Sequence, residues 1–296
     1  MKISILTPTY NRAKFLPNLY ESLVENKKHN IDFEWLIMDD GSTDNTKLVV
    51  DDFIKENKID LKYYYQENQG KMSAINQLVE YATGDYIIDC DSDDYFAKNA
   101  FEIIKANIDK LEQDKELYAL LFLKCDETGE ISGQTFKQED YKTTMFDLYF
   151  KDDVQGEKII LFKSQVRKQF KHKLEEGEKF VTEARMYHEM DKQYKVLCVN
   201  EPIVIGVYQN DGYTKNINKV FVENPKGYFK YFEEMINLNM QGVKLKKRLY
   251  IIKHYILFSY ITKQKDVIKN VKNISNKILT AMLLWPGYLK SYIKIK

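Results

Sequence analysis

Four carboxylates lie within six residues of this chain, at Asp89, Asp91, Asp93 and Asp94, directly after a short apolar run. The apolar run predicts a buried strand, so the carboxylates follow its carboxyl end, where open α/β sheets bind ligands. In an extended backbone Asp91 and Asp93 point to the same side. Two such carboxylates are suitable ligands for Mg²⁺ or Mn²⁺, which could in turn hold a diphosphate. A turn, or a cap for a helix over 97–111, is the alternative explanation.

The first half of the sequence alternates apolar strand patterns with amphipathic helix patterns. Every strand is followed by polar residues, including the segments 7–12, 39–44 and 66–70. This alternation predicts an α/β fold with a Rossmann-like, mostly parallel sheet and helices on both faces, in which the polar loops meet at one edge. The expected strands cover 3–6, 33–38, 61–65 and 86–90, and the expected helices cover 13–25, 45–56 and 71–81.

Beyond residue 111 the order of elements changes. Residues after about 215 are mostly helical in character, so we divide the chain into a body, 1–215, and a helical C-terminal extension, 216–296. The body has two halves, 1–110 and 111–215. In the second half we expect strands over 117–125, 130–136, 158–163, 194–199 and 202–208, and helices over 143–150 and 181–193.

The chain has 296 residues and a net charge of +1, which conceals an uneven distribution. Of 45 basic and 44 acidic residues, 13 basic residues and one acidic residue lie in 243–296, so the tail carries +12 and the rest −11. Three widely spaced cysteines suggest buried thiols in a reducing compartment. No apolar run approaches the roughly 20 residues that span a bilayer. We therefore expect a cytoplasmic protein, at or near the inner face of the cell membrane.

Five motifs stand together in a recognisable order: residues 7–12 (TPTYNR), 39–44 (DDGSTD), 68–76 with Asn68, Gly70 and Asn76, 84–86 (GDY) and 91–94 (DSDD). Their order and spacing resemble those of family 2 glycosyltransferases with the GT-A fold, of the kind that builds bacterial surface polysaccharides. The resemblance is strong over 1–110 and looser over 170–215. It implies an enzyme that transfers a hexosyl or N-acetylhexosaminyl group from a nucleotide-sugar. The body, 1–215, would then be the catalytic domain, with 1–110 as its nucleotide-sugar-binding half and 111–215 as its acceptor half.

The resemblance also assigns the donor site. It implies that Thr9 with Asp39 or Asp40 contacts the nucleobase, that Asp91 lies on the ribose side, and that Asp93 binds Mn²⁺ or Mg²⁺, with Asp91 as a second candidate ligand. Carboxylates suit these roles because they accept from a uracil N–H and bind hard cations. Pro8 and Tyr10 have the alternative of only shaping their loop, and Lys71 of being a solvated lysine. The full donor set is Thr7, Pro8, Thr9, Tyr10, Asp39, Asp40, Asn68, Gly70, Lys71, Asp91 and Ser92.

An inverting transferase needs a base that takes the proton of the acceptor hydroxyl. The family places an acidic residue near the start of a helix in the second half, usually within a Glu-Asp pair, which this chain lacks. Glu183 is our preferred candidate, because Thr182 would cap the helix and leave Glu183 in its first turn. Glu178 is the alternative. Asp211 and Thr214 are weaker candidates for the acceptor side, and an Asp-Gly turn explains them equally well.

The basic tail is rich in tyrosine and isoleucine, which suits the surface of a membrane or a helical dimer interface. No nucleic-acid-binding motif accompanies the charge. We therefore expect an inverting transferase that moves a sugar, from a UDP-sugar, to a hydroxyl of a glycan or lipid-linked glycan. A sugar-phosphate nucleotidylyltransferase is the alternative enzyme, although residues 7–12 lack its glycines. A non-catalytic glycan-binding or scaffold protein is the alternative from another class.

Overall fold

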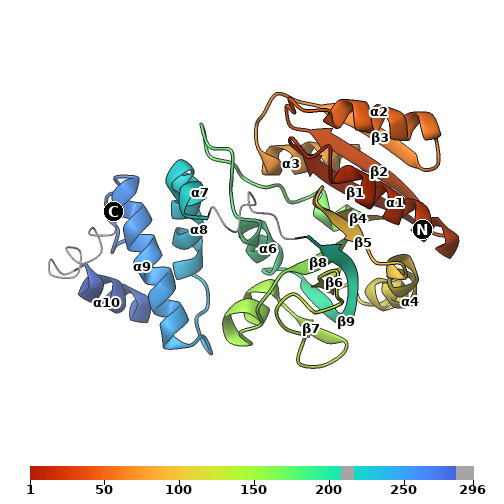
Figure 1. The fold of residues 1–296 in the computed structure, drawn as a ribbon. Helices are drawn as coiled ribbons and strands as arrows, with labels where there is room; N and C mark the ends of the chain where they lie inside the picture. The colour runs from red at the N-terminus through yellow and green to blue at the C-terminus, as the bar shows by residue number, and fades with distance from the viewer. Residues whose placement is uncertain (208–216, 285–296) are drawn as a thin grey trace.

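The computed structural model describes residues 1–207 and 217–284 and has a single nine-stranded sheet (Figure 1). The strands follow the order β3-β2-β1-β4-β8-β6-β9-β5, and β7 also pairs with β9. Strands β3, β2, β1 and β4 are parallel, whereas β8 is antiparallel to both its neighbours. The strands are β1 (Lys2–Thr9), β2 (Asp32–Asp39), β3 (Asp60–Tyr65), β4 (Tyr86–Asp89), β5 (Asp94–Phe96), β6 (Leu117–Cys125), β7 (Tyr141–Thr143), β8 (Lys158–Lys163) and β9 (Lys195–Gly206).

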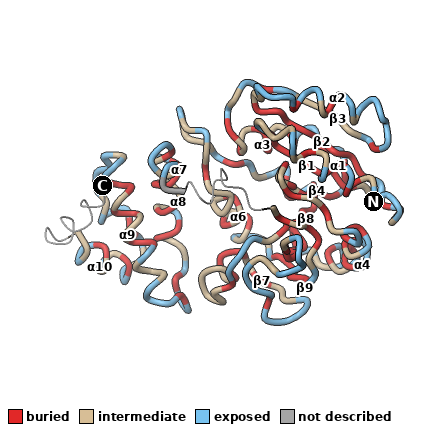
Figure 2. Tube along the Cα trace, in the orientation of Figure 1, coloured by how far each residue is buried: buried red, intermediate tan, exposed pale blue. Residues whose placement is uncertain are grey.

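Helices cover both faces of this sheet, as its alternating buried side chains require. Helices α1, α2 and α4 share one core with Ile5, Trp35 and Phe122, and α3 shares another with Leu6 and Leu121. Figure 2 shows central strands such as β1, β4 and β8 mostly buried and the outer sides of the helices exposed. The helices are α1 (Leu16–Asn26), α2 (Thr46–Glu56), α3 (Lys71–Tyr81), α4 (Ala100–Gln113), α5 (Ser164–Arg167), α6 (Ala184–Met190), α7 (Ile217–Glu223), α8 (Pro225–Ile236), α9 (Leu245–Ile261) and α10 (Ile274–Leu283), with a 3₁₀ turn at Lys27–His29 and a π-helical turn at Asp147–Lys151.

The C-terminal helices α7 to α10 lie away from β1, β2 and β3, with α7 and α8 on the side of α6 and with α9 and α10 beyond them (Figure 1). Helices α8 and α9 pack on each other around a separate core, which includes Phe229, Phe232, Ile252, Tyr255 and Phe258. Among the residues that the structure describes, no helix is long and apolar enough to span a bilayer.

Several sequence-based expectations about elements were wrong. Strand β1 continues through Pro8 to Thr9, because its pairing with β2 extends to Asp39 after its pairing with β4 has ended at Leu6. A proline is tolerated where a strand has lost one neighbour. Residues 130–136 make no strand, only a bridge from Ile131 to Cys125. Gly133 packs directly on the backbone at 155–156, and the backbone N–H of Gln134 donates to the carbonyl oxygen of Gln155.

The two strands expected over 194–208 are one strand, β9. Its register against β6 shifts near Pro202, so a bulge absorbs the residues that looked like a break. The helix expected over 143–150 is a short π-helical turn that starts at Asp147. The helix expected over 97–111 starts at Ala100, because β5 occupies Asp94–Phe96.

Candidate active site

Three neighbouring strands bring the expected donor residues to one edge of the sheet. Thr9 at the end of β1 pairs with Asp39 at the end of β2, and Asp89 at the end of β4 pairs with Leu6 of β1. Because these strands are parallel, the residues that follow them lie at the same edge. Residues 10–13, 40–46 and 90–94 are therefore neighbours, although they lie far apart in the sequence.

The four donor-set residues at positions 7–10, at the end of β1 and just after it, differ in their burial and their hydrogen bonds. Thr7 is buried, and its Oγ1 accepts a hydrogen bond from Trp35 Nε1 at 2.9 Å. Pro8 is buried as well. Thr9 is buried, but its hydroxyl has no hydrogen-bond partner among the described residues. Tyr10 exposes 47% of its surface. Tyr10 is thus the member of this group whose ring is accessible to a ligand, whereas the hydroxyl of Thr9 is buried without a partner.

Asp40 organises the loop between β3 and α3. Its carboxylate accepts from the backbone N–H of Gln69 at 2.7 Å and of Gly70 at 2.8 Å, and its carbonyl accepts from the side-chain amide of Asn68 at 2.9 Å. Asp40 is buried. An added Cβ at Gly70, which has φ +94°, would lie 2.1 Å from the carbonyl oxygen of Lys179, so only glycine fits there.

Asp39 holds the loop after β2 in the same way. One carboxylate oxygen accepts from the backbone N–H of Ser42 and the other from the hydroxyl of Tyr63, both at 2.7 Å. The amide oxygen of Asn11 accepts from the backbone N–H of Thr43 at 2.8 Å and joins this loop to the one after β1. The carboxylates of Asp39 and Asp40 therefore form hydrogen bonds within the protein and hold the loops of the candidate site in place.

Lys71 joins two carboxylates from distant parts of the chain. Its Nζ lies 2.8 Å from Asp91 Oδ1 and 3.2 Å from Glu183 Oε1. Burial opposes the charge on Lys71, but the two carboxylates outweigh this effect and raise its pKa. Burial likewise opposes the charge on Asp91, and the ammonium of Lys71 outweighs it, so that the pKa of Asp91 is lowered. Lys71 and Asp91 are therefore charged at neutral pH.

Asp93, the expected metal ligand, lies in the loop that follows β4, two residues after Asp91. It is half-buried, and burial together with the charge of Asp91 raises its pKa. A divalent cation beside it would remove this repulsion. In the described part of the chain no group of three or more His, Cys, Asp or Glu could hold a metal ion. Carboxylates such as those of Asp91 and Asp93 are the ligand type that Mg²⁺ and Mn²⁺ prefer, and these ions usually complete their coordination with substrate phosphates and water.

A buried ion pair supports this carboxylate loop from behind. Lys124 Nζ lies 2.7 Å from Asp94 Oδ2 and 2.7 Å from Glu157 Oε2. Both Asp94 and Lys124 are buried. An added Cβ at Gly206 would lie 2.2 Å from Lys124 Cε, so the glycine makes room for this lysine. Ser92, the other member of the loop in the donor set, is buried as well.

The two candidate bases have different surroundings. Helix α6 begins at Ala184, so Glu183 directly precedes the first turn and Thr182 does not cap it as expected. Glu183 Oε2 accepts from the hydroxyl of Tyr187 at 3.2 Å, and its Oε1 faces Lys71. The carboxylate of Glu178 accepts instead from two backbone N–H groups in the first turn of α8. Asp211 and Thr214, named for the acceptor side, lie outside the described residues.

Sequence reasoning missed Tyr187 and Lys124. Tyr187 lies four residues after Glu183, a spacing that brings side chains together on a helix and could have found it. Lys124 is the single charge in the otherwise apolar strand 117–125, which signals a buried partner. No sequence signal pointed to Asp94 as that partner.

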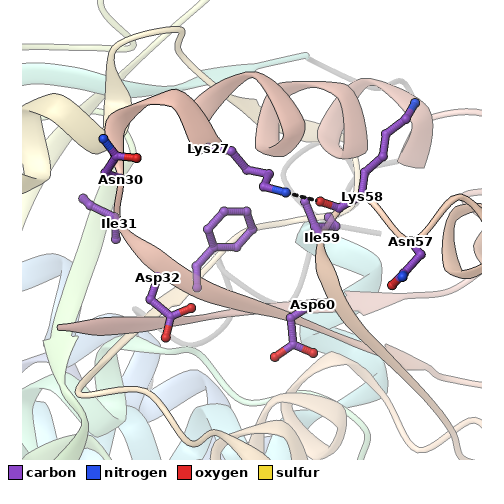
Figure 3. A pocket seen from close by; sticks show the side chains of 9 residues that line it. Lys27, Asn30, Ile31, Asp32, Asn57, Lys58, Ile59 and Asp60 are labelled. Atoms are coloured by element: carbon purple, nitrogen blue, oxygen red, sulfur yellow. Dashed lines mark hydrogen bonds between the residues drawn. The ribbon is translucent and has the colours of Figure 1, made fainter.

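A cavity of about 600 Å³ lies at the opposite edge of the sheet (Figure 3). It is lined by residues before and at the beginnings of β2 and β3, including Asp32, Asp60, Lys27 and Lys58. The donor-set residues follow the carboxyl ends of the strands, so this cavity is separate from the candidate site.

Comparison with known proteins identifies the family of this chain. The family model "Glycosyl transferase family 2" matches residues 4–176. The chain is 34% identical over 128 residues to the glycosyltransferase MG060 of Mycoplasma genitalium, a match that covers 42% of each protein. It is 34% identical over 146 residues to the poly(ribitol-phosphate) beta-N-acetylglucosaminyltransferase TarS of Staphylococcus aureus, over 49% of this chain and 24% of TarS. These matches thus span less than half of the relatives' length.

Solved structures show the same fold. TarS residues 1–349 of S. aureus in complex with UDP-GlcNAc align with a TM-score of 0.59 and 20% identity, over 92% of this chain and 82% of that one. The mannosyltransferase PcManGT of Pyrobaculum calidifontis, in complex with GDP-Man and Mn²⁺, aligns with a TM-score of 0.55 and 15% identity, over 98% and 83%. The fold is GT-A, as predicted, and the chain belongs to glycosyl transferase family 2.

Proposed function

We propose that this glycosyltransferase moves an N-acetylhexosaminyl or hexosyl group from a UDP-sugar to a hydroxyl of a cell-surface glycan, with inversion at the anomeric carbon. The observation that carries the proposal is the contact of Lys71 with both Asp91 and Glu183. It joins a carboxylate at the donor edge to a carboxylate at the start of a helix. The similarity to TarS, whose name and complex specify N-acetylglucosamine and UDP-GlcNAc, supports the donor class.

In this proposal Glu183 is the general base. It takes the proton of the acceptor hydroxyl while the acceptor oxygen bonds to the anomeric carbon and the bond from that carbon to the diphosphate breaks. Lys71 and Tyr187 hold one carboxylate oxygen each and fix its orientation. A carboxylate held in place before the acceptor arrives avoids the cost of ordering it during the reaction.

The donor side uses the carboxylate loop. Asp93, with Asp91 beside it, would hold Mg²⁺ or Mn²⁺, and such an ion supplies positive charge that stabilises the departing diphosphate. The ammonium of Lys71 contributes a second positive charge at the same edge. Tyr10 offers an exposed ring to the nucleoside, and Thr9 beside it has a buried hydroxyl without a partner among the described residues. Asp39 and Asp40 act through the loops that they hold.

For the C-terminal helices we propose contact with an anionic lipid surface. Ile274, Ile278 and Met282 form one stripe on α10, and 76%, 52% and 66% of their surfaces are exposed. The segment between α9 and α10 adds exposed lysines at 263, 265, 269 and 272. A second copy of this surface would bring like charges together, whereas anionic lipid complements them. A lipid-linked glycan acceptor at the inner membrane face would then lie near the enzyme.

The test is release of UDP from a panel of UDP-sugars, with GDP-sugars for comparison, in Mn²⁺ and in EDTA. We expect metal-dependent release of UDP from at least one UDP-sugar and loss of transfer in Glu183→Gln. Release of pyrophosphate from a nucleoside triphosphate would favour the nucleotidylyltransferase. Binding of a glycan without any turnover would favour the non-catalytic alternative.

A further inference from the structure

We infer that Glu178 is a positioning residue through which helix α8 sets the place of the catalytic base. The inference rests on the proposed role of Glu183. Residues 175–181, here called the connecting segment, lead directly to Glu183. This segment lies between α8 on one side and the donor loop at 68–70 on the other, and it is bonded to both.

The connecting segment and α8 exchange hydrogen bonds at the start of the helix. Glu178 Oε1 and Oε2 accept from the backbone N–H groups of Lys226 and Gly227, each at 2.7 Å. The first N–H groups of a helix have no partner within it, and a carboxylate also interacts favourably with the helix dipole. Glu178 thus supplies the cap of α8 from another part of the chain.

Asn224 makes the reciprocal contact. It precedes α8 but its side chain makes no capping bond to its own helix. Its Oδ1 instead accepts from the backbone N–H groups of Lys179 at 3.0 Å and Phe180 at 2.9 Å, and Asn224 is buried. Each partner therefore satisfies backbone groups of the other. Neither can move without breaking these bonds, and Gly227 and Asn224, which take part in them, are buried.

Two further contacts limit the freedom of this junction. An added Cβ at Gly227 would lie 3.2 Å from both Glu178 Oε2 and the carbonyl oxygen of Phe180, which leaves little room for a side chain. Just after Glu183, Arg185 Nη2 lies 2.9 Å from Glu234 of α8, and its Nη1 lies 3.0 Å from Glu175. Glu183 is thus bracketed by α8 contacts before and after it.

The opposite side of the connecting segment touches the donor loop. Lys179 Nζ donates to Asn68 Oδ1 at 2.7 Å, and the backbone of Lys179 packs directly on Gly70. Lys71, which follows Gly70 in the chain, forms an ion pair with Glu183. One short segment therefore links α8, the donor loop and the base, and a shift of α8 displaces Glu183 relative to the donor.

The experiment compares Glu178→Gln with the matched control Glu176→Gln, an exposed glutamate two residues away whose side chain makes no hydrogen bond or ion pair among the described residues. An amide cannot accept from both N–H groups, because its nitrogen is a donor. We expect kcat for transfer from the active UDP-sugar to fall roughly 10- to 100-fold in Glu178→Gln, the size expected for a misplaced group. KM for the donor should change less than about threefold, and Glu176→Gln should match the unmodified protein.

Two readouts separate positioning from other roles. The acidic limb of the pH profile of kcat should persist in Glu178→Gln and vanish in Glu183→Gln, whereas the reverse would make Glu178 the base. Hydrogen exchange should quicken over residues 178–187 and the first turn of α8 in Glu178→Gln. If that variant does not fold, Gly227→Ala tests the same junction by crowding it.

The outcomes for the inference and for the proposed function are distinct. The inference would be overturned if Glu178→Gln matched Glu176→Gln in kcat and in hydrogen exchange. If Glu183→Gln were inactive in the same experiment, the proposed base would stay in place. A Glu183→Gln with normal turnover would overturn the proposed base itself.

Discussion

Lys71 Nζ lies 3.2 Å from Glu183 Oε1, and the same nitrogen lies 2.8 Å from Asp91 Oδ1. The lysine begins the helix after the donor loop, and the glutamate directly precedes a helix of the second half of the chain. Their contact closes the site around one ammonium group. Any charge change at Lys71 or Glu183 therefore affects both the donor edge and the candidate base.

Replacing the base should stop transfer without stopping donor binding. In Glu183→Gln the amide cannot accept the acceptor proton, so we predict a loss of roughly 10²- to 10⁴-fold in kcat. The affinity for UDP, measured by titration calorimetry, should stay within about threefold. A Glu183→Gln with near-normal turnover would show that another group takes the proton.

Removing the ion pair behind the carboxylate loop should destabilise the protein. Lys124→Met leaves Asp94 buried without its partner, a change that costs about 3 to 5 kcal/mol in comparable cases. The control is Lys142→Met, which removes more exposed ion pairs with Asp114 and Glu116 and should cost at most about 1 kcal/mol. Urea unfolding at pH 7 measures both. Equal losses would mean that the buried pair has no special role.

Glu34 should make the free energy of unfolding depend on pH in the acidic range. Burial alone would raise its pKa, but the ammonium of Lys62 and the hydroxyl of Ser4, together with Thr83, outweigh it and lower the pKa to about 2. A lowered carboxylate pKa stabilises the fold above the unfolded value of about 4.3, and this stabilisation is lost as the pH falls towards 2. The shift corresponds to about 3 kcal/mol at pH 7.

The measurement is the free energy of unfolding of Glu34→Gln between pH 7 and pH 3. We predict a deficit of about 3 kcal/mol at pH 7 that shrinks below pH 4.5. The exposed Glu21→Gln is the control and should follow the unmodified protein. A deficit that stays constant over the whole range would exclude the proposed linkage.

The first half of the fold was predictable because local patterns decide it. The helix Lys71–Tyr81 begins and ends as expected, since the apolar spacing and the glycine before it are local signals. Strand β5 was missed because Asp94–Phe96 has only three residues and begins with a carboxylate, so it looked like a turn. Its pairing with β9 is a long-range contact that no local pattern shows.

The site was predictable only in part, for the same reason. The motifs identified the carboxylates and loops, and the carboxyl ends of parallel strands bring them to one edge. The sequence left Glu178 and Glu183 as competing candidates. Their surroundings differ through partners in α8 and α3, which lie about 50 and more than 100 residues away in the chain.

The basic tail should bind anionic membranes through charge and apolar side chains together. A variant with Lys263, Lys265, Lys269 and Lys272 changed to glutamine should lose flotation with phosphatidylglycerol vesicles, because each lysine near such a surface contributes about 1 kcal/mol. High salt should weaken binding of the unmodified protein. Ile274→Ser with Ile278→Ser should weaken the part of the binding that resists salt.

The control changes four exposed lysines of the body, at positions 14, 47, 55 and 98, and so alters the net charge equally. It should still float with the vesicles. If the full-length protein does not bind anionic vesicles and sediments as a dimer, and if Ile274→Ser with Ile278→Ser disrupts that dimer, then α10 is a dimer interface instead.

The most direct test of the proposed donor site is the affinity for UDP, measured by titration calorimetry in Mn²⁺ and in EDTA, with Asp93→Asn beside the unmodified protein and the exposed Asp52→Asn as control. A neutral amide is a poorer ligand for a hard cation than a carboxylate. We predict that Mn²⁺ strengthens UDP binding at least about tenfold, or about 1.4 kcal/mol, in the unmodified protein and in Asp52→Asn, and that Asp93→Asn loses this gain. Equal UDP affinity with and without metal in the unmodified protein would contradict the proposed site.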